Sequence, residues 1–440
     1  MGAESIIGSP LVGNYIGPTF IMVWSIPFAI LQVYCHIHEG GTISGLIESV
    51  SSGKALQIVG EELQKNGWNA FVMLVCFMAF ELVLLLGLPG KKYDGPKTVT
   101  GHVPKYRDTG LTAYIITLLT AYLISEQLGW FNLALVYDYY LAAIVEMNVF
   151  ALVFCLFLYI KGRTFPSSTD NHFDGIFVAD YYRGIELYPR IGKHFDIKMF
   201  TNCRFGMMTW PLLPLCFAAK QRELYGEISN SMWLSVALQL IYCAKFFYWE
   251  RGYMGTTDIM HDRGGYYICW GCLCYLPSTY TVHTLFLTKY PYNYSAPVGA
   301  FIFVAGVVCI FVNYWADYQR MKVRESDGDC KIWGKKAEII RAEYTETREG
   351  KTEKKKNILL CSGFWGVTRH FHYVPEILAS VFWACPIGHG LILPYFYVIF
   401  LTILLFHRAG RDDRKCSEKY GPYWTEYCKK VQYRIIPYVY

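Results

Sequence analysis

Residues 68–88 read WNAFVMLVCFMAFELVLLLGL, a run that is almost entirely apolar. An α-helix rises about 1.5 Å per residue, so a helix of about 20 apolar residues is long enough to cross the hydrocarbon core of a bilayer. Nine further apolar runs cover residues 17–36, 110–125, 139–160, 206–219, 228–249, 264–287, 297–316, 374–388 and 391–407. The sequence therefore predicts an all-α fold, a polytopic membrane bundle of about ten transmembrane helices.

The composition of the whole chain agrees with this fold class. Of 440 residues, 53% are hydrophobic and 17% are charged, whereas an ordinary soluble domain has about 25% charged residues. Aromatic side chains make up 17% of the chain, which is too many for a disordered protein. The net charge of +6 is too small to favour nucleic acid as a partner. Many of the 15 Cys residues lie in apolar runs, where free cysteine behaves as a small hydrophobic residue.

The positive charges gather in alternate loops. Of the 41 Lys and Arg residues, 35 lie in residues 89–109, 161–205, 250–263 and 317–373 and in the tail that begins at Arg408. Cytosolic loops carry the excess of Lys and Arg in membrane proteins. The pattern therefore predicts that both termini and these basic segments are cytosolic. The first 16 residues contain no basic segment, so no cleavable signal peptide is expected.

The polar residues divide this single membrane domain into three regions. Residues 1–160 hold four spans with little polar content and are predicted to be a scaffold. Residues 161–373 combine further spans with cytosolic loops and are predicted to hold the substrate pocket. Residues 374–440 form a hairpin of two short spans, broken by proline and glycine, and a charged tail. The sequence leaves open whether this hairpin crosses the bilayer fully.

Charged side chains crowd the end of the last apolar run. Arg408 and Asp412 are four residues apart, which places them on one face of a helix, and Tyr420 follows. Arginine binds phosphate with two hydrogen bonds, and a carboxylate can bind a ribose or an amide, so this set suits a phosphorylated dinucleotide. Cations at the cytosolic end of a helix also attract anionic lipid, so anchoring at the membrane surface is the alternative interpretation.

Residues 361–375 form a second polar segment, which is rich in aromatic and basic side chains. Trp365 could cover a flat ring, and Arg369 with His372 could bind a phosphate or an amide. No G-x-G-x-x-G fingerprint follows a predicted strand, so a Rossmann domain is not supported.

A third group of ionisable and aromatic residues surrounds the sixth and seventh apolar runs. Ionisable groups at membrane depth are costly and indicate a functional site. The alternative is an interfacial ion pair between Lys245 and Glu250. Cys269, Cys272 and Cys274 have no second cysteine pair nearby, so no metal site is predicted. The candidate site residues in this group are Tyr248, Trp249, Glu250, Asp258, His261, Trp270, Tyr275 and Tyr280.

Several short motifs resemble those of one enzyme family, the sterol reductases. The motifs at the C-terminal end and the GIELYPR segment are similar to two signatures of that family. Others resemble the branch that reduces the C7–C8 double bond, and two are most similar to its plant forms. The motifs are HRAGRD at 407–412, KYG at 419–421, GIELYPR at 184–190, TDI at 257–259, SGFWG at 362–366, RHF at 369–371, KFFYWE at 245–250 and CWGC at 269–272.

The resemblance implies a step of sterol biosynthesis, the NADPH-dependent reduction of the C7–C8 double bond of a Δ5,7-sterol in the endoplasmic reticulum membrane. Its partners would be a sterol that enters from the bilayer, membrane lipid and other enzymes of the pathway. Arg320 stands where many members have Lys, and His372 where many have Asn. Carried over by motif position, the NADPH contacts are Arg320, Arg324, Leu360, Trp365, His372, Arg408, Asp412 and Tyr420.

A carbon–carbon double bond without a carbonyl has no electron sink, so it cannot accept hydride directly. The expected route is protonation followed by hydride capture, in a pocket that excludes water. We predict Tyr248 as the acid, with Glu250, Asp258 and His261 as relays. Aromatic faces can stabilise the developing positive charge and contact the sterol. The residues predicted for this role are Trp249, Trp270, Tyr275 and Tyr280.

Three other functions remain open at this point. The same chemistry could act on the C14 or the C24(28) double bond of a sterol. A non-catalytic sterol-binding scaffold could retain the fold. A membrane methyltransferase would share a C-terminal hairpin and a basic tail, but it would bind S-adenosylmethionine in place of NADPH.

Overall fold

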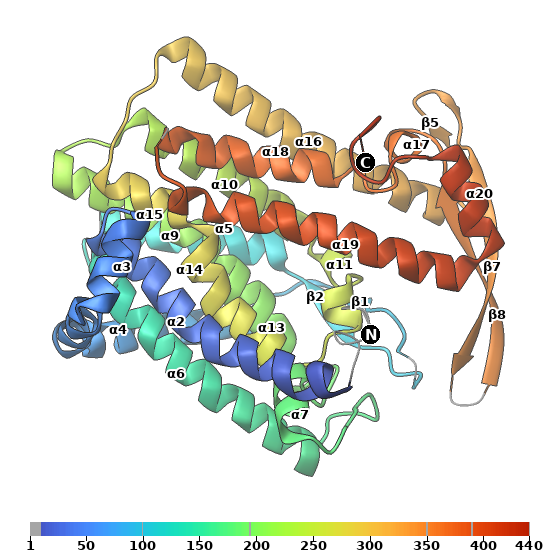
Figure 1. Ribbon diagram of the computed structural model, residues 1–440, viewed down its shortest axis with the longest axis horizontal. Coiled ribbons are helices and arrows are strands. Elements are labelled where there is room, and N and C mark those ends of the chain that lie inside the picture. Colours follow the sequence, from blue (N-terminus) through green and yellow to red (C-terminus); the bar gives the residue numbers. More distant parts are fainter. Residues whose placement is uncertain (1–9, 99, 193–194, 349–350, 389, 440) are drawn as a thin grey trace. The chain divides into compact units, whose positions relative to one another are not determined.

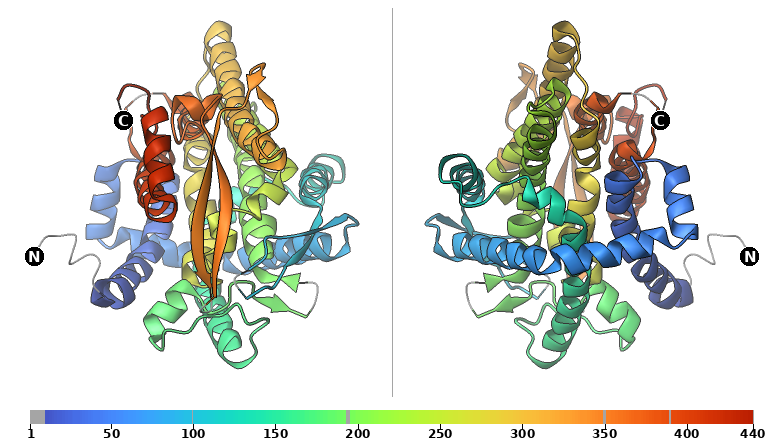
Figure 2. Two further views of the ribbon diagram at one scale, coloured as in Figure 1. Left: turned by 90° about the vertical axis from the view of Figure 1, so that its right-hand side faces the viewer. Right: turned by 90° about the vertical axis from the view of Figure 1, so that its left-hand side faces the viewer.

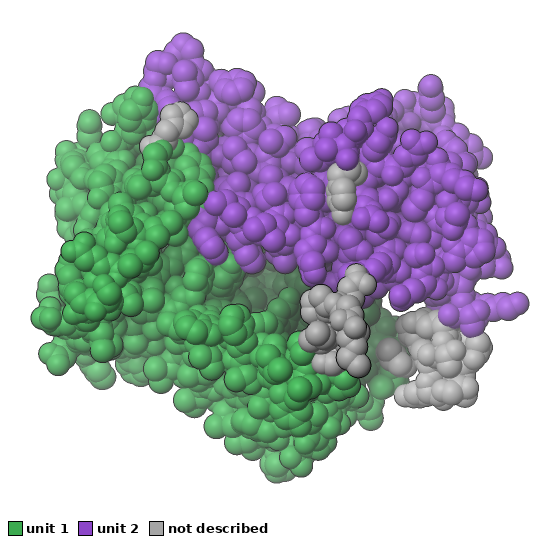
Figure 3. All heavy atoms as spheres, in the orientation of Figure 1, with its two compact units in different colours: residues 1–293, 387–395 green, residues 294–386, 396–440 purple. Residues whose placement is uncertain are grey.

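A computed structural model describes residues 10–98, 100–192, 195–348, 351–388 and 390–439 (Figure 1). It divides into two compact units, which are coloured separately in Figure 3. Unit 1 comprises Met1–Asn293 and Ile387–Tyr395, and unit 2 comprises Tyr294–Pro386 and Phe396–Tyr440. Helix α6 continues past residue 160, the expected end of the first of the three regions predicted from the sequence.

Unit 1 is a bundle of helices whose apolar faces pack on one another. Helix α4 packs on α6 and α9 packs on α10, around buried leucine, alanine and aromatic side chains. Its helices are α2 (Gly17–His38), α3 (Ile43–Ser51), α4 (Lys54–Gly87), α5 (Gly110–Tyr122), α6 (Leu135–Thr164), α7 (Phe177–Arg183), α8 (Ile197–Met199), α9 (Met207–Tyr225), α10 (Asn230–Tyr248), α11 (Glu250–Tyr253), α12 (Thr257–Met260), α13 (Tyr266–Trp270), α14 (Leu276–Tyr280) and α15 (Val282–Lys289).

Wider π-helical turns and two short hairpins complete the described part of unit 1. The π-helical turns are η1 (Val12–Ile16), η2 (Leu123–Gln127), η3 (Phe200–Gly206) and η4 (Gly271–Tyr275), and a 3-10 turn is η6 (Leu393–Tyr395). The antiparallel strand pairs are β1 (Lys91–Asp94) with β2 (Lys105–Asp108), and β3 (Arg190–Ile191) with β4 (Phe195–Asp196).

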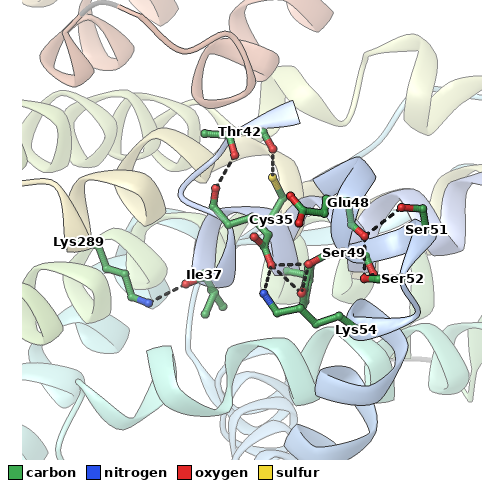
Figure 4. A network of polar contacts seen from close by, with 11 residues as sticks. Cys35, Ile37, Thr42, Glu48, Ser49, Ser51, Ser52, Lys54 and Lys289 are labelled. Atoms are coloured by element: carbon green, nitrogen blue, oxygen red, sulfur yellow. Dashed lines mark hydrogen bonds and ion pairs between the residues drawn. The ribbon is translucent and has the colours of Figure 1, made fainter. Parts of the chain in front are cut away.

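A polar network fixes the turn between α2 and α4 in unit 1 (Figure 4). The ammonium group of Lys54 lies 3.1 Å from a carboxylate oxygen of Glu39, and the hydroxyl groups of Tyr34 and Ser49 donate to the same carboxylate. Lys289 donates to the carbonyl oxygen of Ile37 at 2.6 Å, which ties α15 to the end of α2. These bonds satisfy charges that would otherwise be costly beside an apolar bundle.

Unit 2 combines long helices with a long β-hairpin. Helix α16 packs along α18, and α18 packs on α19. The elements are α16 (Ala296–Glu325), β5 (Lys331–Ile332), β6 (Lys335–Lys336), β7 (Ile339–Arg348), β8 (Lys351–Leu360), α17 (Phe364–Val367), α18 (Tyr373–Ala384), η5 (Cys385–Ile387, whose last residue falls in unit 1), α19 (Phe396–Tyr420) and α20 (Pro422–Lys430).

Helices occur at all ten predicted apolar runs, but only some are long enough to cross a membrane. Five stretches of the described chain meet the length and hydropathy required. The seventh apolar run, residues 264–287, contains no single helix of sufficient length. The helix there is interrupted by the π-helical turn η4 and again at Thr281. Ten transmembrane helices are therefore not confirmed. The five stretches are Val12–His38, Lys54–Gly87, Leu135–Thr164, Ala296–Glu325 and Leu393–Tyr420.

The β7–β8 hairpin is a feature that the apolar pattern does not predict. Its strands pair in register from Ile339 opposite Leu360 to Arg348 opposite Lys351, and Figure 2 shows them running side by side. The inner end packs through Ile340, Ala342 and Leu359 against aromatic side chains of α19 and α20. Residues 348–356 are nearly all charged in the sequence. Their described part, residues 348 and 351–356, therefore belongs to a strand pair, and residues 349–350 lie outside the described residues.

Candidate functional site

All eight residues predicted to bind the cofactor lie in unit 2. They come from elements that are up to 100 residues apart in the chain, so only the fold can gather them. Arg320 and Arg324 are on α16, Leu360 ends β8, Trp365 is in α17, His372 precedes α18, and Arg408, Asp412 and Tyr420 are on α19.

Trp365 is the centre of a stacked group of planar side chains. Its indole is buried, and its Nε1 atom donates to the carbonyl oxygen of Ala316 at 2.7 Å. The guanidinium of Arg320 lies 4.4 Å from the indole centroid, and the His372 ring centroid lies 4.9 Å away. Arg320 is also held by Asp317 at 3.1 Å. A fixed indole with a cation on its face is a surface on which a flat, negatively charged ligand can bind.

A second pair of rings lies beside Asp412. The imidazole of His370 stacks on Tyr373, with centroids 5.1 Å apart, and its Nε2 atom lies 3.9 Å from a carboxylate oxygen of Asp412. Burial lowers the pKa of His370 to about 4, so this ring is neutral at pH 7. The side chain of Asp412 is 53% exposed and is accessible to a ligand hydroxyl. His370 is not among the predicted cofactor contacts, although it belongs to the RHF motif.

Two arginines of this site have no carboxylate partner within ion-pair distance among the described residues. Arg324 interacts electrostatically with Tyr420, and Arg408 with Tyr373, so both face the same group of side chains. The hydroxyl of Tyr420 accepts a hydrogen bond from Asn357 of β8 at 2.6 Å, which fixes the end of α19 on the hairpin. Together with Arg320 these cations could hold the phosphates of a dinucleotide.

The last residues of the chain hold this site in place. The guanidinium of Arg369 donates to the carbonyl oxygens of Val431 and Gln432 at 2.7 and 2.9 Å. The backbone N–H groups of Arg369 and His370 donate to the carbonyls of Tyr433 and Arg434. Arg369 therefore anchors the C-terminal segment beside the RHF motif. Arg369 is predicted from the sequence to bind a phosphate or an amide, whereas its structural role has no signal in the sequence.

The predicted catalytic residues lie in unit 1 and are placed differently from one another. Glu250 is buried in an ion pair with Arg204, which donates to both of its carboxylate oxygens and also to the hydroxyl of Thr109 at 3.1 Å. The charge of Glu250 is therefore paired with that of Arg204. The ammonium of Lys245 lies 4.8 Å from the ring centroid of Tyr242. Arg204 comes 46 residues earlier in the chain, so sequence spacing gives no indication of the pair.

Tyr248 and His261 are exposed, whereas Asp258 is partly buried. Tyr248 is 66% exposed, two residues before the fully buried Glu250. The segment that contains Asp258 and His261 is held by the buried Lys198. Its ammonium donates to the carbonyl oxygens of Ile259 and Asp262 at 2.8 and 2.6 Å, and burial lowers its pKa to about 8. These bonds fix the segment that contains Asp258 and His261.

Three of the four predicted sterol contacts form a continuous series of rings. Trp270 and Tyr275 have centroids 6.2 Å apart, and Tyr275 and Tyr280 have centroids 6.3 Å apart. Trp210 extends the series, 4.9 Å from Tyr280. The fourth predicted contact, Trp249, joins α10 to α11.

The comparisons with known proteins agree with the motifs. The Ergosterol biosynthesis ERG4/ERG24 family matches residues 13–440. The chain is 45% identical over 440 residues to the 7-dehydrocholesterol reductase of Arabidopsis thaliana, with 99% of each chain covered.

More distant relatives span most of the chain as well. It is 38% identical over 373 residues to the 7-dehydrocholesterol reductase of Danio rerio, with 84% of this chain and 77% of that protein covered. It is 32% identical over 380 residues to the Delta(14)-sterol reductase of Methylotuvimicrobium alcaliphilum, with 85% and 84% covered. The resemblance to sterol reductases is thus confirmed, and this chain belongs to the Ergosterol biosynthesis ERG4/ERG24 family.

Proposed function

We propose that this protein reduces the C7–C8 double bond of a Δ5,7-sterol with NADPH, as a step of sterol biosynthesis in the endoplasmic reticulum membrane. The observation that carries the proposal is the 45% identity, over nearly the full length of both chains, to a protein named 7-dehydrocholesterol reductase. The lower identity of 32% to a Delta(14)-sterol reductase makes the C14 double bond the second candidate. Family membership argues against the methyltransferase alternative.

The side chains of unit 2 fit the cofactor that this reaction needs. Arg320, Arg324 and Arg408 would bind its phosphates, and several arginines favour NADPH over NADH because of the additional 2′-phosphate. Trp365 and His372 offer planar faces to a ring, and Asp412 would accept hydrogen bonds from ribose hydroxyl groups. When bound, NADPH supplies the hydride. The protein's own residues must therefore bind it, orient it and keep water away from the reacting carbon.

Tyr248 is the sequence-based candidate for the proton donor, with Glu250, Asp258 and His261 as relays. Its hydroxyl belongs to an exposed side chain, and the charge of Glu250 is balanced by Arg204. A Tyr248→Phe protein tests this assignment directly. Tyr248 is not the proton donor if that variant folds, binds NADPH and retains wild-type turnover.

The test of the function is an incubation of the detergent-solubilised protein with 7-dehydrocholesterol and NADPH, followed by mass spectrometry of the sterols. We expect cholesterol with NADPH and little or none with NADH. If no product forms, sterols with C14 or C24(28) double bonds are the next substrates. If these are unchanged too and NADPH does not bind, the non-catalytic scaffold replaces the proposal.

A further inference from the structure

Three polar atoms in unit 1 are buried around the Arg204–Glu250 ion pair without a hydrogen-bond partner among the described residues. They are Oε2 of Glu81, the phenolic oxygen of Tyr93 and Nε of Arg204. Glu81 interacts electrostatically with Arg204, and Tyr93 with both Glu250 and Arg204. Buried polar groups are rarely left without partners, because each one forfeits its bonds to water. Three of them around one ion pair indicate a place where a mobile polar species is bound.

The charges of this group determine the protonation state of Glu81. The side chain of Glu81 is fully buried in α4, and its Oε1 atom accepts a hydrogen bond from Thr117 at 2.6 Å. Arg204 supplies one positive charge, which the bidentate pair with Glu250 already balances. A second ionised carboxylate would leave a net negative charge in a medium of low dielectric constant. Glu81 is therefore held as a carboxylic acid, with its proton on the unpartnered Oε2.

Glu81 is one helical turn away from Phe77, which packs on an apolar cluster that includes two of the residues proposed to contact the sterol. It follows Phe77 by one helical turn, so the two side chains share a face of α4. The Phe77 ring lies 5.6 Å from that of Phe205, and both belong to the apolar cluster that contains Trp270 and Tyr275. The apolar residues of this cluster exclude water, which could otherwise capture a carbocation.

A cavity offers the route by which the acid can regain a proton. Thr109, which accepts a hydrogen bond from Arg204, is also part of the wall of a cavity of about 200 Å³ at the end of α4. Basic side chains line the same cavity, namely Lys92, Lys105 and Arg107. A cavity of this size has room for several water molecules. The cavity therefore reaches the residue that binds Arg204 at the edge of the buried group.

We propose that the proton donor to the sterol double bond is the carboxylic acid of Glu81 rather than Tyr248, and that water from the cavity beside Thr109 returns the proton; this rests on the proposed function. The O–H bond of Glu81 breaks as the π electrons of the double bond form a C–H bond. The cation left on the other carbon takes hydride from NADPH, so the sterol gains two electrons and NADP⁺ is released. A proton from the solvent then restores the acid, so each turnover consumes one NADPH and one proton.

The experiment compares Glu81→Gln, which keeps the size and the Thr117 acceptor, with Glu146→Gln. Glu146 is a partly buried carboxylate on another helix, α6, and it also has an oxygen without a partner among the described residues, so it is a matched control. We expect turnover of 7-dehydrocholesterol to fall about 10²–10⁴-fold in Glu81→Gln, the range typical of general acids, and to stay at the wild-type value in Glu146→Gln. Sterol and NADPH affinities should be unchanged, and Glu81→Asp should restore part of the turnover.

Infrared spectroscopy supplies a readout that does not depend on turnover. The wild-type protein should show the C=O band of a protonated carboxyl group that shifts in D₂O, and this band should be missing in Glu81→Gln. Unchanged turnover in Glu81→Gln, or a spectrum identical to that of the wild type, overturns the assignment. If the wild type and Glu81→Gln are both active, the role of Glu81 is refuted and the proposed function stands. A wild type that binds the sterol but reduces none refutes the proposed function, and the donor role with it.

Discussion

At the scale of single residues, predictability depends on how far apart the interacting partners lie in the chain. Arg408 and Asp412 could be placed on one helix face from their spacing alone, and the structure has both on α19. The partner of Glu250 could not be found in this way, because Arg204 reaches it only through tertiary packing. The same holds for Lys198, whose burial is visible only once the carbonyl groups around it are known.

The first prediction at this scale concerns phosphate binding. We expect Arg408→Ala to raise the KM for NADPH, with little change in sterol affinity, because a charge in contact with the cofactor is lost. Arg414→Ala is the matched control, since Arg414 is exposed on the same helix but on another face. Steady-state kinetics at varied NADPH concentration measure both variants. An unchanged KM for NADPH in Arg408→Ala would show that Arg408 does not bind the cofactor.

The second prediction concerns the neutral His370. Burial lowers its pKa to about 4, whereas an unperturbed histidine titrates near 6.5. Between these values the unfolded chain binds more protons than the folded one, so stability falls as the pH falls from about 6.5 towards 4. We expect His370→Gln to have a weaker dependence of melting temperature on pH in this window. Thermal unfolding of the solubilised protein at several pH values measures it, and parallel curves for the two proteins would contradict it.

At the scale of elements, the apolar helices were predictable and the charged strands were not. Each predicted apolar run contains helix in the structure, because burying apolar side chains requires the backbone to satisfy its own hydrogen bonds. The β7–β8 hairpin has no comparable run of apolar residues in its sequence. Residues 351–357 are nearly all polar, and only the inner ends of the strands carry apolar side chains that pack on α20. Pairing of strands, rather than a pattern within either one, defines this element.

The C-terminal segment gives the prediction at this scale. A chain that ends at Lys430 loses the carbonyl groups that bind Arg369 and the backbone of His370. We expect this truncation to weaken NADPH binding strongly, because the RHF motif is no longer fixed, while the helices of unit 1 remain folded. Cofactor binding by calorimetry and helix content by circular dichroism measure the two effects. Wild-type NADPH affinity in the truncated protein would show that the segment does not position the site.

At the scale of the whole molecule, the predicted site residues divide between the two compact units rather than following the order of the chain. All predicted cofactor contacts lie in unit 2, and all predicted sterol and catalytic residues lie in unit 1. The sequence could not give this division, because residues 387–395 return to unit 1 between two segments of unit 2. The motifs predicted which residues contact the cofactor and which contact the sterol. The fold shows which unit contains each of these two sets.

The topology prediction belongs to this scale. The charge bias of the loops predicts that the β7–β8 hairpin is cytosolic and that residues 289–295 face the opposite side. An N-glycosylation acceptor inserted in residues 289–295 should therefore be modified in microsomes, whereas one inserted in the hairpin should not. Electrophoretic mobility before and after glycosidase treatment reports the modification. Modification in the hairpin would reverse the orientation proposed for the chain.

The β7–β8 hairpin has one further consequence, which concerns contact between molecules. It is a two-stranded sheet, and in the described part of the chain no third strand pairs with either of its outer edges. Such edges offer rows of N–H and C=O groups to which another copy could add a strand. Exposed charges such as Glu343, Lys354 and Lys356 make that addition unfavourable. The density of charge in this segment thus acts as protection against self-assembly into extended sheets.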